Sequence, residues 1–213
     1  MFEDKRFNSV KHPGEYLDYL CHRPAGGGKR PLLLYIHGAG SRGKSLSQLN
    51  HVGPIGELEK GRDIPAVILA PQCHEETWFD LFHVLCEFIQ SAMAWEDVDP
   101  DRVYVTGNSM GGYATWQLCI SHPDWFAAAV PVCGGGMHWE AKRMIDLPIW
   151  AFHGDKDDTV PVEESIKMVG CIKWHGGTKA KLTVLPGTGH NAWDPAYAND
   201  EMWAWLFAQR KGA

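Results

Sequence analysis

The amino-acid sequence lacks the features that mark membrane-spanning, exported and nucleic-acid-binding proteins. No stretch approaches the ~20 uninterrupted apolar residues that a membrane-spanning helix needs. The start of the chain, MFEDKR, does not lead from a basic segment into an apolar one, so we predict no signal peptide and expect a cytoplasmic location. Lys and Arg form no cluster, and the net charge is -6, so nucleic acid is not an expected partner.

Patterns typical of disulfide frameworks and metal sites are also missing. The six cysteines stand singly without CxxC spacing, and several lie in apolar runs, which indicates reduced, buried thiols. The segment 74–76 (HEE) does not continue to HExxH, and no two histidines stand four apart within one predicted helix, so we predict no metal site. The length of 213 residues and the hydrophobic content of 45% suit one globular domain spanning residues 1–213.

Short apolar runs alternate with helical patterns along the chain. The runs are apolar throughout, as in strands covered on both faces, and lie at 32–36, 66–70, 103–106, 127–132, 148–152 and 181–185. An early antiparallel or edge strand is predicted at 15–21, and helices are predicted at 78–95, 110–121, 162–174 and 194–209. This alternation predicts an α/β fold with a mostly parallel central sheet and helices on both faces.

Residues 38–45 (GAGSRGKS) match the phosphate-loop pattern GxxxxGKS, and their first part matches the dinucleotide pattern GxGxxG. Both patterns would place a phosphate at the start of a helix. A phosphate loop should open a long helix, but Gly53-Pro54 interrupts the chain within about two turns. Asp63, the acid at the spacing that dinucleotide binding needs, precedes its strand rather than following it. A P-loop nucleotide-binding protein using Gly38 to Ser45 is therefore the weaker hypothesis.

Residues 107–111 (GNSMG) match GxSxG and stand between a predicted buried strand and a predicted helix. In this setting the serine sits on a sharp, strained turn at the carboxyl edge of the sheet, and the glycines remove side chains that would collide with neighbouring segments. Ser109 is therefore the candidate nucleophile. The N–H of Met110, at the head of the helix, would lie beside it without a partner inside the helix.

A serine nucleophile needs a general base, and the base needs an orienting carboxylate, in the chain order Ser, acid, His. The loop after the run 148–152 carries Asp155, Asp157 and Asp158, among which chemistry alone does not choose. His190 follows the run 181–185 in a glycine-rich loop and is the candidate base. His175 precedes that strand and so belongs to the opposite edge of the sheet.

An oxyanion hole needs two N–H groups aimed at the charge that develops on the attacked carbonyl oxygen. Met110 supplies one of them. The second should come from the loop 37–40 (HGAG), which follows the strand 32–36. This role accounts for the glycines that imitate a phosphate loop.

Together these residues resemble the α/β-hydrolase superfamily. The resemblance is strongest to its small members without a cap domain: the phospholipase/carboxylesterase group with the acyl-protein thioesterases, the dienelactone-hydrolase relatives, and the esterases often labelled predicted peptidases. It rests on the serine elbow, on residues 153–161 (HGDKDDTVP) and on Gly189-His190. It implies that Asp157 is the triad acid and that Ala39 and Met110 are the oxyanion donors.

The similarity of residues 72–78 and 190–193 to the predicted-peptidase branch further implies that Trp78 and Trp193 wall the substrate site, with Gly40 beside them. The short segment between Cys133 and Leu147 leaves no room for the cap of larger lipases, so an open cleft is expected.

The predicted function is that of a serine carboxylesterase acting on short-chain or small aromatic or sugar esters, with no cofactor. Its expected partner is a small-molecule ester substrate. A serine peptidase of the aminopeptidase type would use the same triad and is the alternative. The oligomeric state is left open, a homodimer included.

Overall fold

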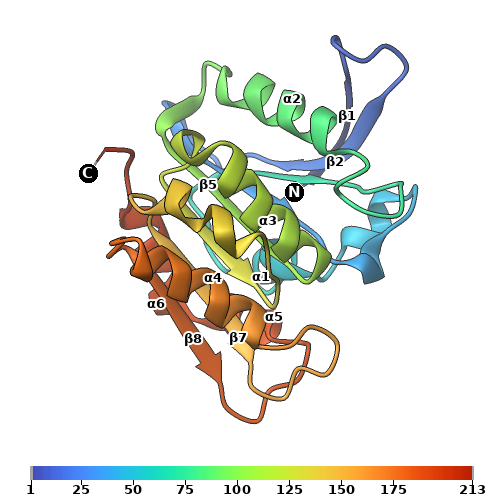
Figure 1. Cartoon of the computed structure of the whole chain (residues 1–213). Coiled ribbons are helices and arrows are strands. Elements are labelled where there is room, and N and C mark those ends of the chain that lie inside the picture. The colour runs from blue at the N-terminus through green and yellow to red at the C-terminus, as the bar shows by residue number, and fades with distance from the viewer. Residues whose placement is uncertain (1, 213) are drawn as a thin grey trace.

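The computed structural model describes residues 2–212, which form one mixed sheet between two layers of helices (Figure 1). The sheet order is β1-β2-β4-β3-β5-β6-β7-β8. The strands are β1 Phe2–Asn8, β2 Tyr16–His22, β3 Arg30–Ile36, β4 Val67–Pro71, β5 Val98–Asn108, β6 Ala128–Val132, β7 Ile149–Gly154 and β8 Ala180–Leu185. Strands β3 to β8 run parallel to one another, whereas β2 is antiparallel to both β1 and β4.

The helices divide between the two faces of the sheet. They are α1 Gly53–Glu59, α2 Phe82–Met93, α3 Met110–Ser121, α4 Glu163–Trp174, α5 Trp193–Ala198 and α6 Asp200–Ala208. Helices α2, α3 and α4 share one core with Leu32 and Leu34 of β3, and α1, α5 and α6 share the other core with Leu33 and Tyr35 (Figure 1). Because alternate side chains of β3 enter opposite cores, its sequence is apolar throughout.

The predicted fold class is confirmed, and each of the six apolar runs overlaps a strand, although the strand starts one residue inside the run at 66–70, 127–132 and 148–152. The strand predicted at 15–21 is antiparallel but is not at the edge, because β1 covers it. Strand β1 has no apolar run that would predict it, because its charged residues EDKR lie mostly exposed.

Two predicted helices have different bounds in the structure. The helix expected at 78–95 begins only at Phe82, after a turn in which the Asp80 carboxylate accepts the Thr77 N–H at 2.8 Å. The helix expected at 194–209 is divided at Asn199, whose side chain accepts the Met202 N–H at 3.1 Å and so starts α6.

The segment 38–45 does not adopt the strand-loop-helix arrangement of a phosphate loop. It contains the short 3₁₀ turn Ala39–Ser41 and leads into a second one, Leu46–Leu49. Gly53-Pro54, expected to interrupt the chain, instead opens the short helix α1, with the proline in its first turn.

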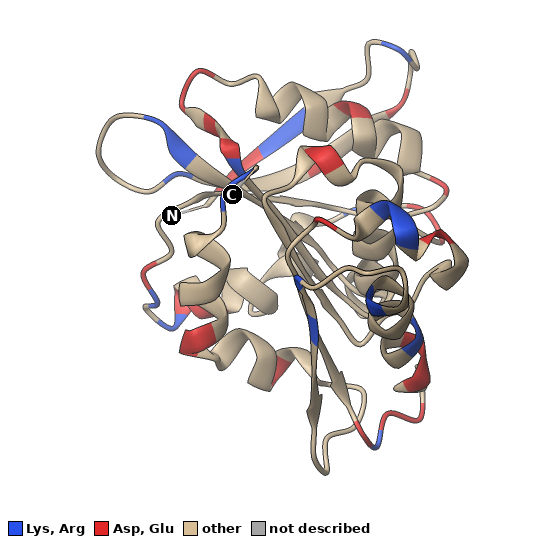
Figure 2. Cartoon of the chain, turned by 60° about the vertical axis from the view of Figure 1, so that its left-hand side comes forward, with Lys and Arg blue, Asp and Glu red and all other residues tan. Residues whose placement is uncertain are grey.

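Charged residues of both signs are interspersed over the helices and loops (Figure 2). Among residues 2–212, no helix is long and apolar enough to cross a membrane.

Candidate active site

Ser109 stands at the sharp turn between β5 and α3. Its backbone φ of 55° is positive, which is strained for a residue with a side chain. A Cβ atom at Gly111 would collide with the carbonyl oxygen of Ile36, and one at Gly107 would collide with the same oxygen. The two glycines therefore let the turn approach β3 closely enough to present the Ser109 hydroxyl at the carboxyl edge of the sheet.

The structure brings Ser109, His190 and Asp157 together in one hydrogen-bonded chain. The Nε2 atom of His190 lies 2.8 Å from the Ser109 hydroxyl oxygen, and its Nδ1 atom lies 2.8 Å from Oδ2 of Asp157. The carboxylate can only accept, so Nδ1 carries the hydrogen and Nε2 is left to accept the serine proton. Asp157 and His190 lie in the loops that follow β7 and β8, at the same edge of the sheet as the serine.

The Asp157 carboxylate is fully buried and held from several sides. Its Oδ1 atom accepts the backbone N–H groups of Thr159 at 3.0 Å and Val160 at 2.9 Å. Burial raises the pKa of Asp157, but hydrogen bonds from Val160, His190 and Thr159 outweigh it and hold the pKa below its usual value. Asp155 and Asp158, the other acids of this loop, are exposed.

His153 is a site residue that sequence reasoning quoted only as part of a motif. It is fully buried at the end of β7, with Nδ1 2.8 Å from the Ser165 hydroxyl and Nε2 2.8 Å from the Val160 carbonyl oxygen. A carbonyl only accepts, so Nε2 carries a hydrogen, which also faces Oδ2 of Asp157 at 3.3 Å. His153 thus holds the acid loop in place. The signal in the sequence is a polar residue within an apolar strand, directly before the acid loop.

The expected oxyanion donors both stand at the start of a helical turn. Ala39 begins the 3₁₀ turn after β3, and Met110 begins α3, so neither N–H has a partner within its own turn. Gly38 lets its loop pass close to Ser109, the candidate nucleophile: a Cβ atom at Gly38 would lie 3.4 Å from the Cβ of Ser109. Gly40, in the same loop, is exposed.

His37 and its contacts fix the path of the loop after β3, which carries the expected oxyanion donor Ala39. The Cys73 backbone N–H donates to His37 Nε2 at 2.9 Å, so Nδ1 carries the hydrogen and donates to the Gly38 carbonyl at 2.7 Å. The indole Nε1 of Trp78 donates to the His37 carbonyl at 2.9 Å. These bonds tie the loop after β3 to the loop after β4.

The prediction that Trp78 walls the substrate site is wrong. The side chain is fully buried in the core beneath α2, and its ring meets that of His37 edge-on with centroids 5.0 Å apart. Trp78 therefore supports the loop after β3 from within the core. Trp193 is half-buried, and its ring centroid lies 5.5 Å from that of His190, so it remains a candidate wall.

Cys133, which sequence analysis treated only as one of six thiols, lies within the site. Its sulfur, a carboxylate oxygen of Asp157 and a ring nitrogen of His190 are all within 4.8 Å of one another. The residue has a positive φ of 40°, and burial raises its pKa to about 12, so the thiol is protonated and unreactive at neutral pH.

Acid is expected to destabilise the protein through His37. Burial lowers the pKa of His37 to about 4, whereas the unfolded chain has the ordinary value of about 6.5. Between these values the unfolded chain binds a proton that the folded protein does not, so the free energy of unfolding falls as the pH falls. By pH 4.5 the loss should be about 2 to 3 kcal/mol.

Urea denaturation at neutral pH and at pH 4.5 measures this loss, with His37→Gln as the matched variant. The variant lacks the titrating ring and should lose less stability in acid than the wild type. An equal loss in both proteins would contradict the assignment to His37.

Comparison with known proteins gives the family. The dienelactone hydrolase family matches residues 72–202. Poly(3-hydroxyalkanoate) depolymerase C of Paucimonas lemoignei is 41% identical over 114 residues, covering 54% of this chain and 27% of that protein. The chain spans less than half the length of the curated relatives that it matches.

Solved structures agree with this result. The crystal structure of a thermostable esterase is 31% identical with a TM-score of 0.86, over 98% of this chain and 63% of that one. Est1E from Butyrivibrio proteoclasticus shares the fold at 18% identity, with a TM-score of 0.75 over 96% of this chain and 99% of that one. Because the family match covers more than half of the chain, the protein belongs to the dienelactone hydrolase family of the α/β-hydrolase superfamily.

Proposed function

We propose that this protein is a serine carboxylesterase. The observation that carries the proposal is the hydrogen-bonded chain from Ser109 through His190 to Asp157, with the serine on a strained turn beside two helix starts. The relatives support the chemical class. One is named as an esterase, and another as the depolymerase of a polyester.

The arrangement supports a two-step reaction through an acyl-enzyme. His190 Nε2 takes the proton of Ser109 as its oxygen attacks the ester carbonyl, and the N–H groups of Ala39 and Met110 bind the oxyanion. His190 then returns the proton to the leaving alcohol. In the second step His190 activates a water molecule, which releases the acid and regenerates the serine. Asp157 stabilises the imidazolium in both steps.

The substrates proposed are short-chain or small aromatic or sugar esters. Between β6 and β7 the chain forms only the short 3₁₀ segment His138–Met144, so no cap domain covers the site at this point. His190 keeps 21% of its side chain exposed although Asp157 behind it is buried. An open site of this kind suits small or surface-presented acyl groups better than long lipid chains, which need an enclosed apolar tunnel.

Fluorophosphonate labelling followed by peptide mapping tests the proposal. The reagent should attach to Ser109 and stop hydrolysis of p-nitrophenyl acetate in proportion to the labelled fraction. A panel of esters with acyl chains from acetyl to dodecanoyl, with matched aminoacyl amides, then separates a small-ester esterase from a peptidase. Labelling at another residue, or faster cleavage of the amides, would contradict the proposed function.

A further inference from the structure

The loop between β1 and β2, residues 9–15, is fastened to the side of α2. The Glu87 carboxylate on α2 accepts the Ser9 hydroxyl at 2.5 Å and the backbone N–H groups of Val10 at 2.8 Å and Lys11 at 3.2 Å. The loop therefore has a defined position against the helix, independently of any ligand.

Hydrogen bonds within the loop fix the backbone positions of His12 and Glu15. The His12 N–H donates to the Ser9 hydroxyl at 2.8 Å, and the Glu15 N–H donates to the His12 carbonyl at 3.0 Å. Glu15 in turn accepts the Ser9 N–H at its backbone carbonyl, at 2.9 Å. These two backbone positions are thus set without a ligand, which lowers the conformational-entropy cost of binding a ligand between the two side chains.

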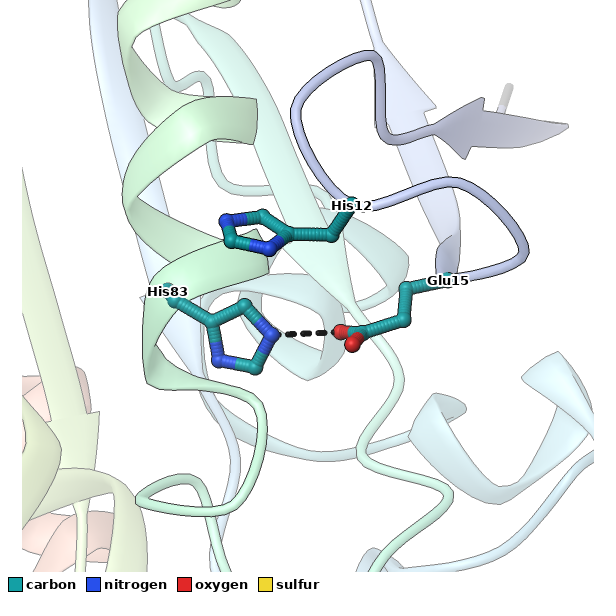
Figure 3. A group of neighbouring side chains, drawn as sticks. All are labelled: His12, Glu15 and His83. Atoms are coloured by element: carbon teal, nitrogen blue, oxygen red, sulfur yellow. Dashed lines mark hydrogen bonds and ion pairs between the residues drawn. The ribbon is translucent and has the colours of Figure 1, made fainter.

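His12 and Glu15 face His83, which stands in the first turn of α2 (Figure 3). The Nε2 atom of His83 lies 2.6 Å from Oε2 of Glu15. The ring centroids of His12 and His83 are 4.4 Å apart, with the planes nearly perpendicular at 77°. One nitrogen of each ring and one carboxylate oxygen all lie within 4.8 Å of one another.

Two imidazoles and one carboxylate are one of the donor sets found in three-ligand zinc sites, in which the fourth position is left to water. Zn²⁺ bonds to nitrogen and oxygen measure about 2.0 to 2.2 Å, so tetrahedral ligand atoms lie about 3.4 Å apart. The Glu15 and His83 side chains are each 42% exposed and His12 is half-buried, so these side chains have room to rotate toward that spacing. Ca²⁺ and Mg²⁺ prefer oxygen ligands and suit this site poorly.

We propose that His12, Glu15 and His83 bind one divalent transition-metal ion, Zn²⁺ being the best match, and that the ion ties the loop 9–15 to α2. The site is separate from the proposed catalytic centre. The loop joins β1 to β2, and in the sheet order β4 and β3 lie between β2 and the strand β5 that leads to Ser109. The proposal does not rest on the esterase function.

A simple surface ion pair is the competing explanation, and the chain contains one for comparison. His51 Nδ1 lies 2.6 Å from Glu59 Oε2, as close as in the proposed site. Among residues 2–212, this pair has no third donor grouped with it, and the other group of three donors is Cys133, Asp157 and His190 in the active site. The His51–Glu59 pair is therefore a matched control for binding by two groups only.

Sequence patterns could not reveal this site. His12 and His83 are 71 positions apart, and neither belongs to a recognised ligand spacing. The ligand spacings whose absence predicts no metal site span only a few residues. Convergence of the three side chains depends on how the β1–β2 loop meets α2.

Carbethoxylation of histidines by diethyl pyrocarbonate, mapped by mass spectrometry with and without Zn²⁺, tests the proposal residue by residue. Zn²⁺ should protect His12 and His83 and leave His51 reactive. Equilibrium dialysis of the full chain with Zn²⁺ should show a site lost in His12→Ala and in His83→Gln, and retained in His51→Ala. Affinity should fall about 100-fold or more, since losing a residue that only orients a ligand already costs about 10- to 100-fold.

His83→Gln keeps a hydrogen-bond donor for Glu15 while removing the imidazole, so a loss of binding in this variant reports metal coordination rather than a displaced loop. Circular dichroism confirms that each variant is folded. Unchanged zinc affinity in the folded His12 and His83 variants would overturn the proposal. So would protection by zinc of His190 alone, which would place the ion in the active site.

Discussion

Replacement of Ser109 by alanine is expected to lower kcat for p-nitrophenyl acetate by about a million-fold, with the fold unchanged. The hydroxyl oxygen is the atom proposed to bond to the acyl group, and no other hydroxyl or thiol among the contacts of His190 Nε2 in residues 2–212 can replace it. Cys133 lies nearby, but its raised pKa keeps it a neutral thiol. What remains in the variant is the contribution of the oxyanion donors and of substrate binding.

The measurement is steady-state hydrolysis at saturating substrate, with Ser91→Ala as the control. Ser91 is an exposed serine on α2, outside the proposed machinery, and its replacement should leave kcat unchanged. Near-wild-type turnover by a Ser109→Ala protein with a native circular dichroism spectrum would remove Ser109 from the mechanism.

Replacement of Asp157 by asparagine is expected to lower kcat by about ten-thousand-fold. The structure explains why so similar a side chain should fail. The backbone N–H groups of Thr159 and Val160 both point at Oδ1, so the asparagine oxygen must occupy that position. The amide NH₂ then takes the place of Oδ2, 2.8 Å from Nδ1 of His190.

The NH₂ group at this position is closer to Nδ1 of His190 than the asparagine oxygen, which would lie at 3.0 Å, and it donates a hydrogen bond that Nδ1 is expected to accept. The ring hydrogen then moves to Nε2, which can no longer take the Ser109 proton. The same NH₂ also faces the N–H of His153 Nε2 across 3.3 Å, where two donors repel each other. The variant should therefore lose stability as well as activity.

Asp158→Asn is the matched control, because Asp158 is the exposed neighbour in the same loop. Its activity should be close to that of the wild type, while urea denaturation should show a lower free energy of unfolding for Asp157→Asn alone. A decrease in kcat of less than about tenfold for Asp157→Asn would show that the carboxylate does not set the tautomer of His190, since the wrong tautomer costs far more.

Local sequence patterns were informative wherever one backbone feature demands particular residue types. The turn at Ser109 needs glycine at 107 and 111, because a side chain at either position would strike the Ile36 carbonyl. The apolar runs predicted strands correctly, because a strand between two helical layers has no face exposed to water. Each signal involves residues only a few positions apart, so it can be recognised without knowing the rest of the fold.

Residues that act through distant partners were harder to assign. Trp78 was expected at the substrate site, but its indole N–H bonds to the His37 carbonyl from inside the core. The three aspartates at 155–158 were equivalent by chemistry, and the resemblance to relatives singled out Asp157. In the structure Asp157 is the one that lies against His190, while the other two are exposed.

The sequence by itself determined the α/β class, the serine turn and the loops that leave the carboxyl ends of the strands, because these follow from short-range backbone geometry and from apolar spacing. Only the tertiary structure decided which side chains from those loops meet, the hydrogen-bonding roles of His37 and His153, and the meeting of His12, Glu15 and His83. Each of these contacts joins residues through the packing of separate segments, and packing of that kind leaves no fixed spacing along the chain.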